Sequence, residues 1–459
     1  MTSTFSRRAL LSSVSVAATL TACTDDIIAP TSPSPSSSPT SSAAPDTPFG
    51  TLAPAHLRVA IFDGGYGTGY AHYVADSLQD RLTGVTVAVT GLERISDLDL
   101  AADPPDVVNN SGAGALPIGS MLDQLEPLND LVDAPNLEGT PIKDTLYSSA
   151  LSPGTFDGRL LALNYVFTVY GLWYSASLFE ERGWSLPATW DEMLELGELA
   201  SKEQRYLFAW SPDAATYYLE LAISSAIKES GDEVRRALDG VAGGAWQHPA
   251  VLRTLTQLEE CVRRGFMQPV DPDAGYLATQ ATWSLEGRSL LYPSGAWIER
   301  EMLDQTAEGF RMTCGPGPTL TSSPTMPHAA IHASAAEAFV VPKAAASVVG
   351  GKEFLRTMLS RDAAAHFAVT NLVPTIVKDT VPADTGSTSL GAQTRMLAEA
   401  GDHVFSWRFI SHYGLQQPFD ALMTRFLSGD LTTEELTVEL QRHTDEVRDD
   451  PAIELYTVE

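Results

Sequence analysis

The first folded stretch of the chain alternates short apolar runs with a helical pattern. "LRVAIF" (Leu57–Phe62) and "VTVAVTGL" (Val85–Leu92) predict strands, and the glycine-rich segment Gly64–Leu82 between them predicts a turn followed by a helix. "DVVNNSGAGAL" (Asp106–Leu116) predicts a further strand that runs into a polar loop. Strands that alternate with helices indicate an α/β fold with a largely parallel sheet, whose ligands bind at the carboxyl ends of the strands.

The middle of the chain is mainly helical by pattern. Thr189 followed by Glu192 has the form of a capping box. The apolar positions that recur behind it at helical spacing are Trp190, Met193, Leu194, Leu196 and Leu199. Pro249–Phe266 and Gly350–Thr370 show the same periodicity, so each predicts a helix. A chain of 459 residues, 44% of them hydrophobic, can bury a larger hydrophobic core than a single domain normally holds. We therefore expect two lobes.

The N-terminal residues have the composition of an export signal. Arg7 and Arg8 precede an apolar stretch that ends at "LTAC" (Leu20–Cys23), which has the form of a lipobox in which Cys23 carries the lipid. An ordinary secretory signal is the alternative, and export by the general or the twin-arginine route stays open. Residues 24–56 begin with a Ser-, Thr- and Pro-rich segment that predicts a disordered tether.

Charge and cysteine content exclude several classes of partner. The formal net charge of -29 argues against nucleic acid as a partner. The glycines of "GGYGTG" do not have the GxGxxG spacing of a dinucleotide site, and no cysteine–histidine cluster suggests a metal, so we expect neither cofactor nor metal. Besides Cys23, only Cys261 and Cys314 are present, either as one disulfide or as two buried thiols.

Candidate chemistry points to binding rather than catalysis. The chain has no GxSxG, HExxH or P-loop motif, although a carboxylate pair of the glycosidase type stays open among 58 acidic residues. Aromatic and amide side chains instead gather in loops, and this combination suits the apolar faces and hydroxyl rims of sugars. Trp297, after the apparent turn Pro293–Ala296, is the most prominent of them.

Four segments together resemble a known family. They are "GLWYSASLFEERGWSLPATWDEMLELGELA" (Gly171–Ala200), "GRSLLYPSGAW" (Gly287–Trp297), "AFVVPKAAASVVGGKEFLRTML" (Ala338–Leu359) and "NLVPTI" (Asn371–Ile376). They are similar to segments of the extracellular solute-binding proteins of ABC importers. "VAIFDGGYGTGYA", "PPDVVNNSGAGA" and "LALNYVFTVYGLWYS" resemble the actinobacterial lipoproteins for N-acetylglucosamine and chitobiose. The chain departs from the family at Ser175, where many members have Asn, and in the "NLVPTI" segment, which lacks a glycine.

The resemblance implies a periplasmic-binding-protein-like fold of two α/β lobes, residues 57–164 with 335–390 and residues 165–334 with 391–459, joined by crossover strands. It implies a sugar held in the cleft between them, a membrane permease as partner and no enzymatic activity, for an exported monomer anchored by lipid to the outer face of the cytoplasmic membrane. The ligand-binding residues expected are Tyr66, Asn109, Asn110, Ser111, Asn164, Tyr165, Trp210, Tyr217, Trp297 and Trp407. A sugar sensor, a secreted carbohydrate-active enzyme and a polyamine or peptide ligand are the alternatives. Acidic cleft residues would favour a cation, whereas these predicted residues are neutral.

Overall fold

Three of the predicted strands pair in parallel within a nine-stranded sheet. In the computed structural model, β3 (Ala55–Phe62) pairs along its whole length with β4 (Val85–Leu92) and also with β5 (Val107–Asn109), all in parallel. Helix α1 (Gly69–Arg81) follows β3 and contacts β4. Its residues Val74 and Leu78 are buried in the hydrophobic core. The predicted order of strand, helix and strand is therefore confirmed.

The structure describes residues 46–458 except 53–54, 65, 112–113, 117, 148, 271–274, 452 and 454. Cys23 and most of the predicted tether lie outside these residues. The last part of the predicted tether contains β1 (Asp46–Thr47), β2 (Gly50–Thr51) and the start of β3. In the described part of the chain, no helix combines the length and the hydropathy needed to cross a membrane.

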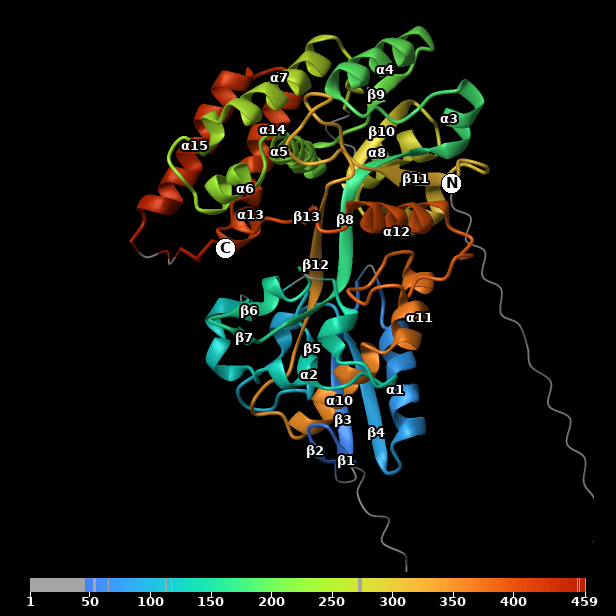
Figure 1. Cartoon of the computed structure of the whole chain (residues 1–459), viewed down its shortest axis with the longest axis vertical. Coiled ribbons are helices and arrows are strands. Elements are labelled where there is room, and N and C mark those ends of the chain that lie inside the picture. The colour runs from blue at the N-terminus through green and yellow to red at the C-terminus, as the bar shows by residue number, and fades with distance from the viewer. Residues whose placement is uncertain are drawn as a thin grey trace, which may run out of the picture. The chain divides into compact units, whose positions relative to one another are not determined.

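Two long strands connect the parallel strands to the rest of the sheet. β8 (Leu163–Ser175) and β12 (Ile331–Val340) run antiparallel, from Ala333 opposite Val169 to Phe339 opposite Leu163 (Figure 1). β12 also pairs with β5, and the second half of β8 pairs with β10 (Ser289–Gly295) and β11 (Met312–Gly315). The sheet order is β4-β3-β5-β12-β8-β10-β9, with β9 at Tyr206–Phe208 and β13 (Val404–Phe405) beside β12.

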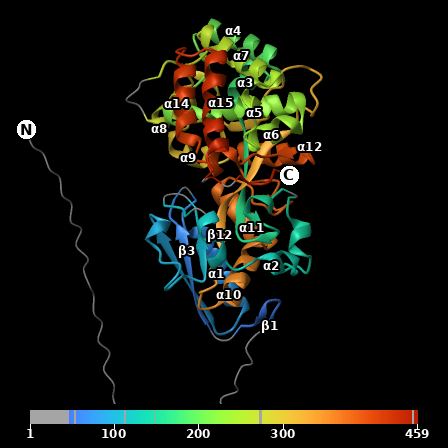
Figure 2. The same cartoon turned by 90° about the vertical axis from the view of Figure 1, so that its left-hand side faces the viewer.

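A second group of elements is mainly helical. It contains α4 (Trp190–Lys202), α5 (Thr216–Ser230), α7 (Pro249–Arg263), α14 (Gln416–Leu427) and α15 (Thr433–Asp449), of which α14 and α15 lie side by side (Figure 2). Thr189 caps α4 by accepting a hydrogen bond from the Glu192 amide, but the Glu192 carboxylate binds the amide of Ala188 rather than that of Thr189. Trp190, Met193 and Leu196 are buried as predicted, whereas Leu199 is 40% exposed.

One predicted helix is two helices. Gly350–Thr370 is divided into α10 (Val348–Met358) and α11 (Arg361–Asn371). The break occurs because Ser360 acts as an N-cap and accepts a hydrogen bond from the Ala363 amide at 3.2 Å. The prediction of one continuous helix was wrong, since hydrophobic periodicity alone does not show a cap inside the segment.

The shorter elements complete the fold. The helices are α2 (Asn129–Asp133), α3 (Ala176–Arg182), α6 (Asp232–Asp239), α8 (Tyr276–Ser284), α9 (Ile298–Glu301), α12 (Thr388–Ala400) and α13 (Phe409–His412), and the strands are β6 (Thr155–Phe156) and β7 (Arg159–Leu160). Cys261 lies in the helical core and Cys314 in the core around β3 and β8, and both are free thiols. The boundaries predicted for the two lobes stay a prediction.

Candidate ligand-binding cavity

A cavity of ≈ 490 Å³ lies at the edge of the sheet where the sequence predicts that ligand binds. Phe62, the last residue of β3, and Asn109, the last residue of β5, both line it, so it lies at the carboxyl ends of two parallel strands. Its lining residues are Phe62, Tyr66, Tyr70, Asn109, Trp297, Arg300, Glu301, Leu303, Asp304 and Glu337. Two other surface hollows of ≈ 570 and ≈ 470 Å³ have no aromatic lining residue, which makes them poorer candidates for a sugar.

Trp297 presents a half-buried ring to the cavity. Its ring contacts that of Tyr170, at a centroid distance of 5.7 Å and an interplanar angle of 82°, and that of Tyr217 at 5.8 Å. The ring lies over Gly295, where a Cβ atom would come within 2.0 Å of Cζ3 of the tryptophan. The predicted turn is different: Pro293–Gly295 is the end of β10, paired with β8, and the turn comes at Ala296 and Trp297.

Phe62 is a second aromatic side chain held in the same manner. Its ring lies over Gly64, where a Cβ atom would come within 2.0 Å of Cε1 of the ring. Each ring is therefore supported by a glycine two positions away in the sequence. Because glycine has no Cβ, the ring can rest directly on the backbone, and this orders the ring before any ligand binds.

Asn109 anchors a hydrogen-bonded cluster at one end of the cavity. Its Oδ1 accepts from the Phe62 amide at 3.3 Å, and its Nδ2 donates to Ser111 Oγ at 3.2 Å and to Glu337 Oε2 at 3.4 Å. Ser111 Oγ also accepts from the Ala338 amide at 3.0 Å. Both Nδ2 hydrogens of Asn109 are thus used inside the protein, and Ser111 links Asn109 to the backbone of β12.

Glu337 supplies the carboxylate of this cluster. Burial raises the pKa of Glu337, and its hydrogen bonds from Asn109 and Ser111 oppose that rise. Burial and the nearby charge of Glu337 raise the pKa of the Tyr66 and Tyr70 hydroxyls well above the ordinary value, so both stay protonated. The backbone of Glu337 has a φ of 59°, in the left-handed region that residues other than glycine seldom adopt.

The opposite wall carries both signs of charge. Arg300, Glu301 and Asp304 come from α9 and the 3-10 turn Leu303–Gln305 that follows it. Burial raises the pKa of Glu301, while hydrogen bonds from Gln280 and Tyr276 lower it. With Glu337, the lining therefore contains three carboxyl groups and one guanidinium group.

The structure brings together part of the predicted ligand set. Tyr66, Asn109 and Trp297 line the cavity, Ser111 holds Asn109, and Tyr217 supports the ring of Trp297. Trp407 is buried against His332, with ring centroids 3.7 Å apart, and His332 stacks in turn on Tyr170 at 4.4 Å. Trp407 therefore lies behind the aromatic wall rather than on the cavity.

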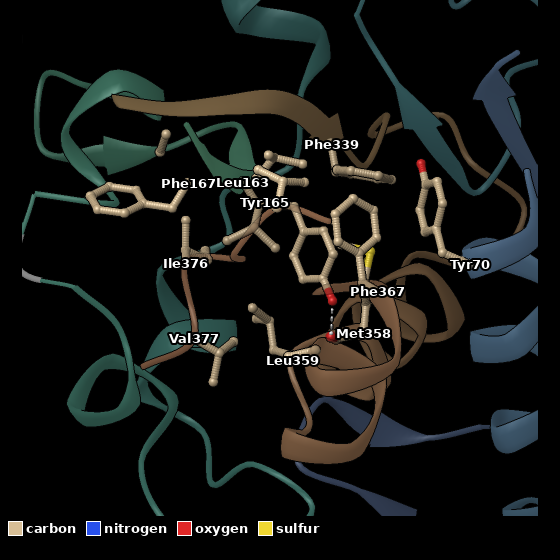
Figure 3. Packing of buried hydrophobic residues seen from close by; sticks show 14 of the residues in the cluster. Tyr70, Leu163, Tyr165, Phe167, Phe339, Met358, Leu359, Phe367, Ile376 and Val377 are labelled. Carbon is tan, nitrogen blue, oxygen red and sulfur yellow. Dashed lines mark hydrogen bonds between the residues drawn. The ribbon is translucent and has the colours of Figure 1, made fainter. Parts of the chain in front are cut away.

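Four other predicted residues have structural roles instead. Both functional groups of the Asn110 side chain bind the backbone of Leu116 at 2.8 Å and hold the loop after β5. Tyr165 is 1% exposed and donates its hydroxyl hydrogen to the carbonyl of Met358 at 2.9 Å (Figure 3). Trp210 is buried in the helical core, and Asn164 is buried within β8. None of the four is among the lining residues of the cavity, and a loop-like sequence does not show which way a side chain points.

Sequence reasoning also missed cavity residues, namely Phe62, Tyr70, Arg300, Glu301, Leu303, Asp304 and Glu337. Two signals could have indicated them. Phe62 is the last residue of a predicted strand at the edge expected to bind ligand, and Glu337 is the one acidic residue within "IHASAAEAFV".

Comparison with known proteins identifies the family. The family model described as bacterial extracellular solute-binding protein matches residues 90–365. The chain belongs to this family. The chain is 45% identical over 414 residues to the diacetylchitobiose binding protein NgcE of Streptomyces coelicolor, an alignment that covers 89% of this chain and 88% of that protein.

Solved structures of solute-binding proteins share the fold. A chitin oligosaccharide binding protein superposes with a TM-score of 0.66 at 19% identity, covering 85% of this chain and 98% of that one. The apo form of RafE from Streptococcus pneumoniae gives a TM-score of 0.68 at 18% identity, covering 86% and 98%. The predicted family and fold class are confirmed, and the family relationship also confirms that the chain is a solute-binding protein and not an enzyme.

Proposed function

We propose that this solute-binding protein captures N-acetylglucosamine or a chito-oligosaccharide, with diacetylchitobiose as the first candidate, and delivers it to the membrane permease of an ABC importer. The relationship to the diacetylchitobiose binding protein supports the ligand class, because it extends over nearly the whole of both chains. The Trp297 ring at the cavity is the observation in this chain that carries the proposal.

The cavity has the chemistry that a pyranose ring requires. Trp297 and Phe62 offer flat apolar surfaces for the C–H faces of sugar rings, and the Tyr66 and Tyr70 hydroxyls offer hydrogen bonds to its rim. Neither tyrosine hydroxyl has a hydrogen-bond partner among the described residues, so both are free to bind a ligand. A volume of ≈ 490 Å³ is within the usual range for small-molecule sites.

The cellular setting belongs to the same proposal. The protein is exported, and Cys23 carries a lipid that anchors the monomeric body to the outer face of the cytoplasmic membrane. Ligand favours one arrangement of the two lobes about β8 and β12, and the permease recognises that arrangement. The family relationship supports the extracellular setting, and the lipobox supports the anchor.

The test is a titration of the purified protein with diacetylchitobiose, followed by calorimetry and by thermal unfolding, with cellobiose, a polyamine and a short peptide as comparison ligands. A ligand that binds only the folded state raises the melting temperature. At a hundredfold excess over Kd it stabilises the folded state by about 2.7 kcal/mol. We expect diacetylchitobiose to bind and Trp297→Ala to weaken it by about 1 to 3 kcal/mol.

Trp184→Ala is the matched control, because Trp184 is also half-buried but packs on the helical core away from the cavity. It should lower the melting temperature without changing Kd. Binding of the polyamine or the peptide alone would contradict the proposal.

A further inference from the structure

We propose that Glu337 is the specificity-determining residue of the cavity, and that it accepts a hydrogen bond from the nitrogen of a 2-amino sugar, so that the ligand class extends to sugar units with a free, positively charged amine. The inference rests on the proposed function, because it assumes that a sugar binds in this cavity. It deepens that function by naming the chemical group that the protein reads.

Hydrogen-bond accounting makes Glu337 an acceptor for the ligand. Asn109 Nδ2 donates to Ser111 and to Glu337, so Asn109 has no donor hydrogen left for a sugar. A carboxylate has about four acceptor positions, and only the Asn109 and Ser111 contacts involve that of Glu337 among the described residues. The remaining acceptor positions of Glu337 therefore favour a ligand group that donates hydrogen.

The orientation of Glu337 directs its carboxylate away from the ladder between β12 and β8. Its neighbours Ala336 and Ala338 pair with Val166 and Asn164, whereas Glu337 is left out of the register. Its φ of 59° accompanies this local departure from strand geometry, and its side chain reaches the wall of the cavity. An alanine-rich strand thus contributes one carboxylate to the site.

Charge around the cavity favours an ammonium group over a neutral amide. Glu301 and Asp304 line the opposite wall, and Arg300 is the one cationic side chain among the lining residues that the structure describes. An ammonium group is attracted to a carboxylate by its charge as well as by the hydrogen bond, whereas a neutral amide N–H offers the hydrogen bond alone. The neutral set predicted from sequence gave no reason to expect this preference, and the carboxylates of the cavity supply it.

The experiment compares diacetylchitobiose with its fully deacetylated form at a pH where the amines are protonated. Calorimetry on the purified wild-type protein and on Glu337→Gln gives four dissociation constants. We expect both sugars to bind the wild type. Glu337→Gln should weaken the deacetylated sugar by roughly tenfold or more, and the acetylated sugar by only a few-fold, since glutamine keeps an acceptor but loses the charge.

Two further variants separate charge from folding. Glu337→Asp keeps the charge and should still bind the deacetylated sugar more tightly than Glu337→Gln does. Glu446→Gln, on the exposed side of α15, should change the dissociation constant of neither sugar. Equal losses for the two sugars in Glu337→Gln, or no binding of the deacetylated sugar to the wild type, would overturn the inference while leaving the proposed function intact. If neither sugar binds the wild type, the proposed function itself fails.

Discussion

The ring of Tyr170 meets the ring of Trp297 edge to face, with centroids 5.7 Å apart and planes at 82°. Tyr170 belongs to β8, and its ring also stacks on that of His332 of β12, with centroids 4.4 Å apart. The side chain that we propose as the sugar platform is therefore supported by both long strands of the sheet. The ring of Tyr170 therefore connects a ligand on Trp297 to the strands predicted to join the lobes.

Tyr170 should support binding through its ring. An edge-to-face aromatic pair contributes about 0.5 to 1.5 kcal/mol beyond burial, so Tyr170→Ala should weaken diacetylchitobiose by about 2- to 12-fold. Tyr170→Phe keeps the ring and should bind within about twofold of the wild type. Calorimetric titration of the two variants checks this, and an equal loss in both would assign the effect to the hydroxyl instead.

Gly295 should position the ring of Trp297. A methyl group at this position would lie 2.0 Å from the ring, so Gly295→Ala forces the tryptophan out of its place and should weaken sugar binding about as much as Trp297→Ala. The quenching of tryptophan fluorescence by acrylamide should increase at the same time. Gly391→Ala is the control, since Gly391 lies within α12 with open space around its Cβ position, and it should leave binding unchanged.

Tyr165 should contribute to stability and not to binding. Tyr165→Phe removes the hydrogen bond to the Met358 carbonyl and should lower the free energy of unfolding by about 1 kcal/mol. The affinity for sugar should stay the same, because the hydroxyl is buried between β8 and α10. Urea unfolding and calorimetry measure the two effects separately, and a loss of affinity without a loss of stability would return Tyr165 to the ligand site.

Glu220 should make stability depend on pH. Burial, with the charge of Asp420, raises the pKa of Glu220 to about 8, and the residue lies beside Tyr170 and Tyr217. The folded state keeps this proton to higher pH than the unfolded state does, so the contribution of Glu220 is present below the unfolded pKa of about 4.5 and is lost as pH rises towards 8. Well above the folded-state pKa the contribution should no longer change.

Glu220→Gln should remove that dependence. Urea midpoints at pH 5 and pH 8 should differ less in the variant than in the wild type, and the variant should be the more stable protein at pH 8. The same decline in both proteins would show that other groups cause it.

The stability of the protein should not depend on redox conditions, because the two cysteines outside the N-terminal segment are separate thiols. Cys261 and Cys314 are buried in different cores, and burial raises the pKa of the Cys261 thiol to about 12, which makes it unreactive at neutral pH. A reducing agent should leave the melting temperature unchanged. Thiol titration should find both groups only after denaturation, and a titre of none would indicate a disulfide.

Local chemistry accounts for what could be predicted of the fold. Val85–Leu92 was predicted with the bounds that β4 has, because its valines recur at every second position, which is the period of a strand. Thr189 was recognised as a cap because capping depends on residues close in sequence. Gly350–Thr370 was predicted as one helix, because the choice between a mid-helix serine and a cap at Ser360 depends on packing.

The candidate site was predictable only in part, because the direction of a side chain also depends on packing. Sequence indicated Trp297, Tyr66 and Asn109, whose residue types and positions near strand ends suit sugar binding. It also proposed Tyr165 and Trp210, which have the same composition but point into the cores. No pattern distinguishes an aromatic side chain that packs inside from one that faces a cavity, because that depends on which elements cover it.

The sequence by itself determined the fold class, the order of the first elements and the family, since these depend on local periodicity and on motifs that are contiguous in the chain. Only the tertiary structure decided that Glu337 reaches Asn109 across 228 positions of sequence, that Trp297 rests on Gly295 between Tyr170 and Tyr217, and that both cysteines are free. Such relationships depend on the pairing of distant strands and on the packing between them. Short-range propensities carry no information about either.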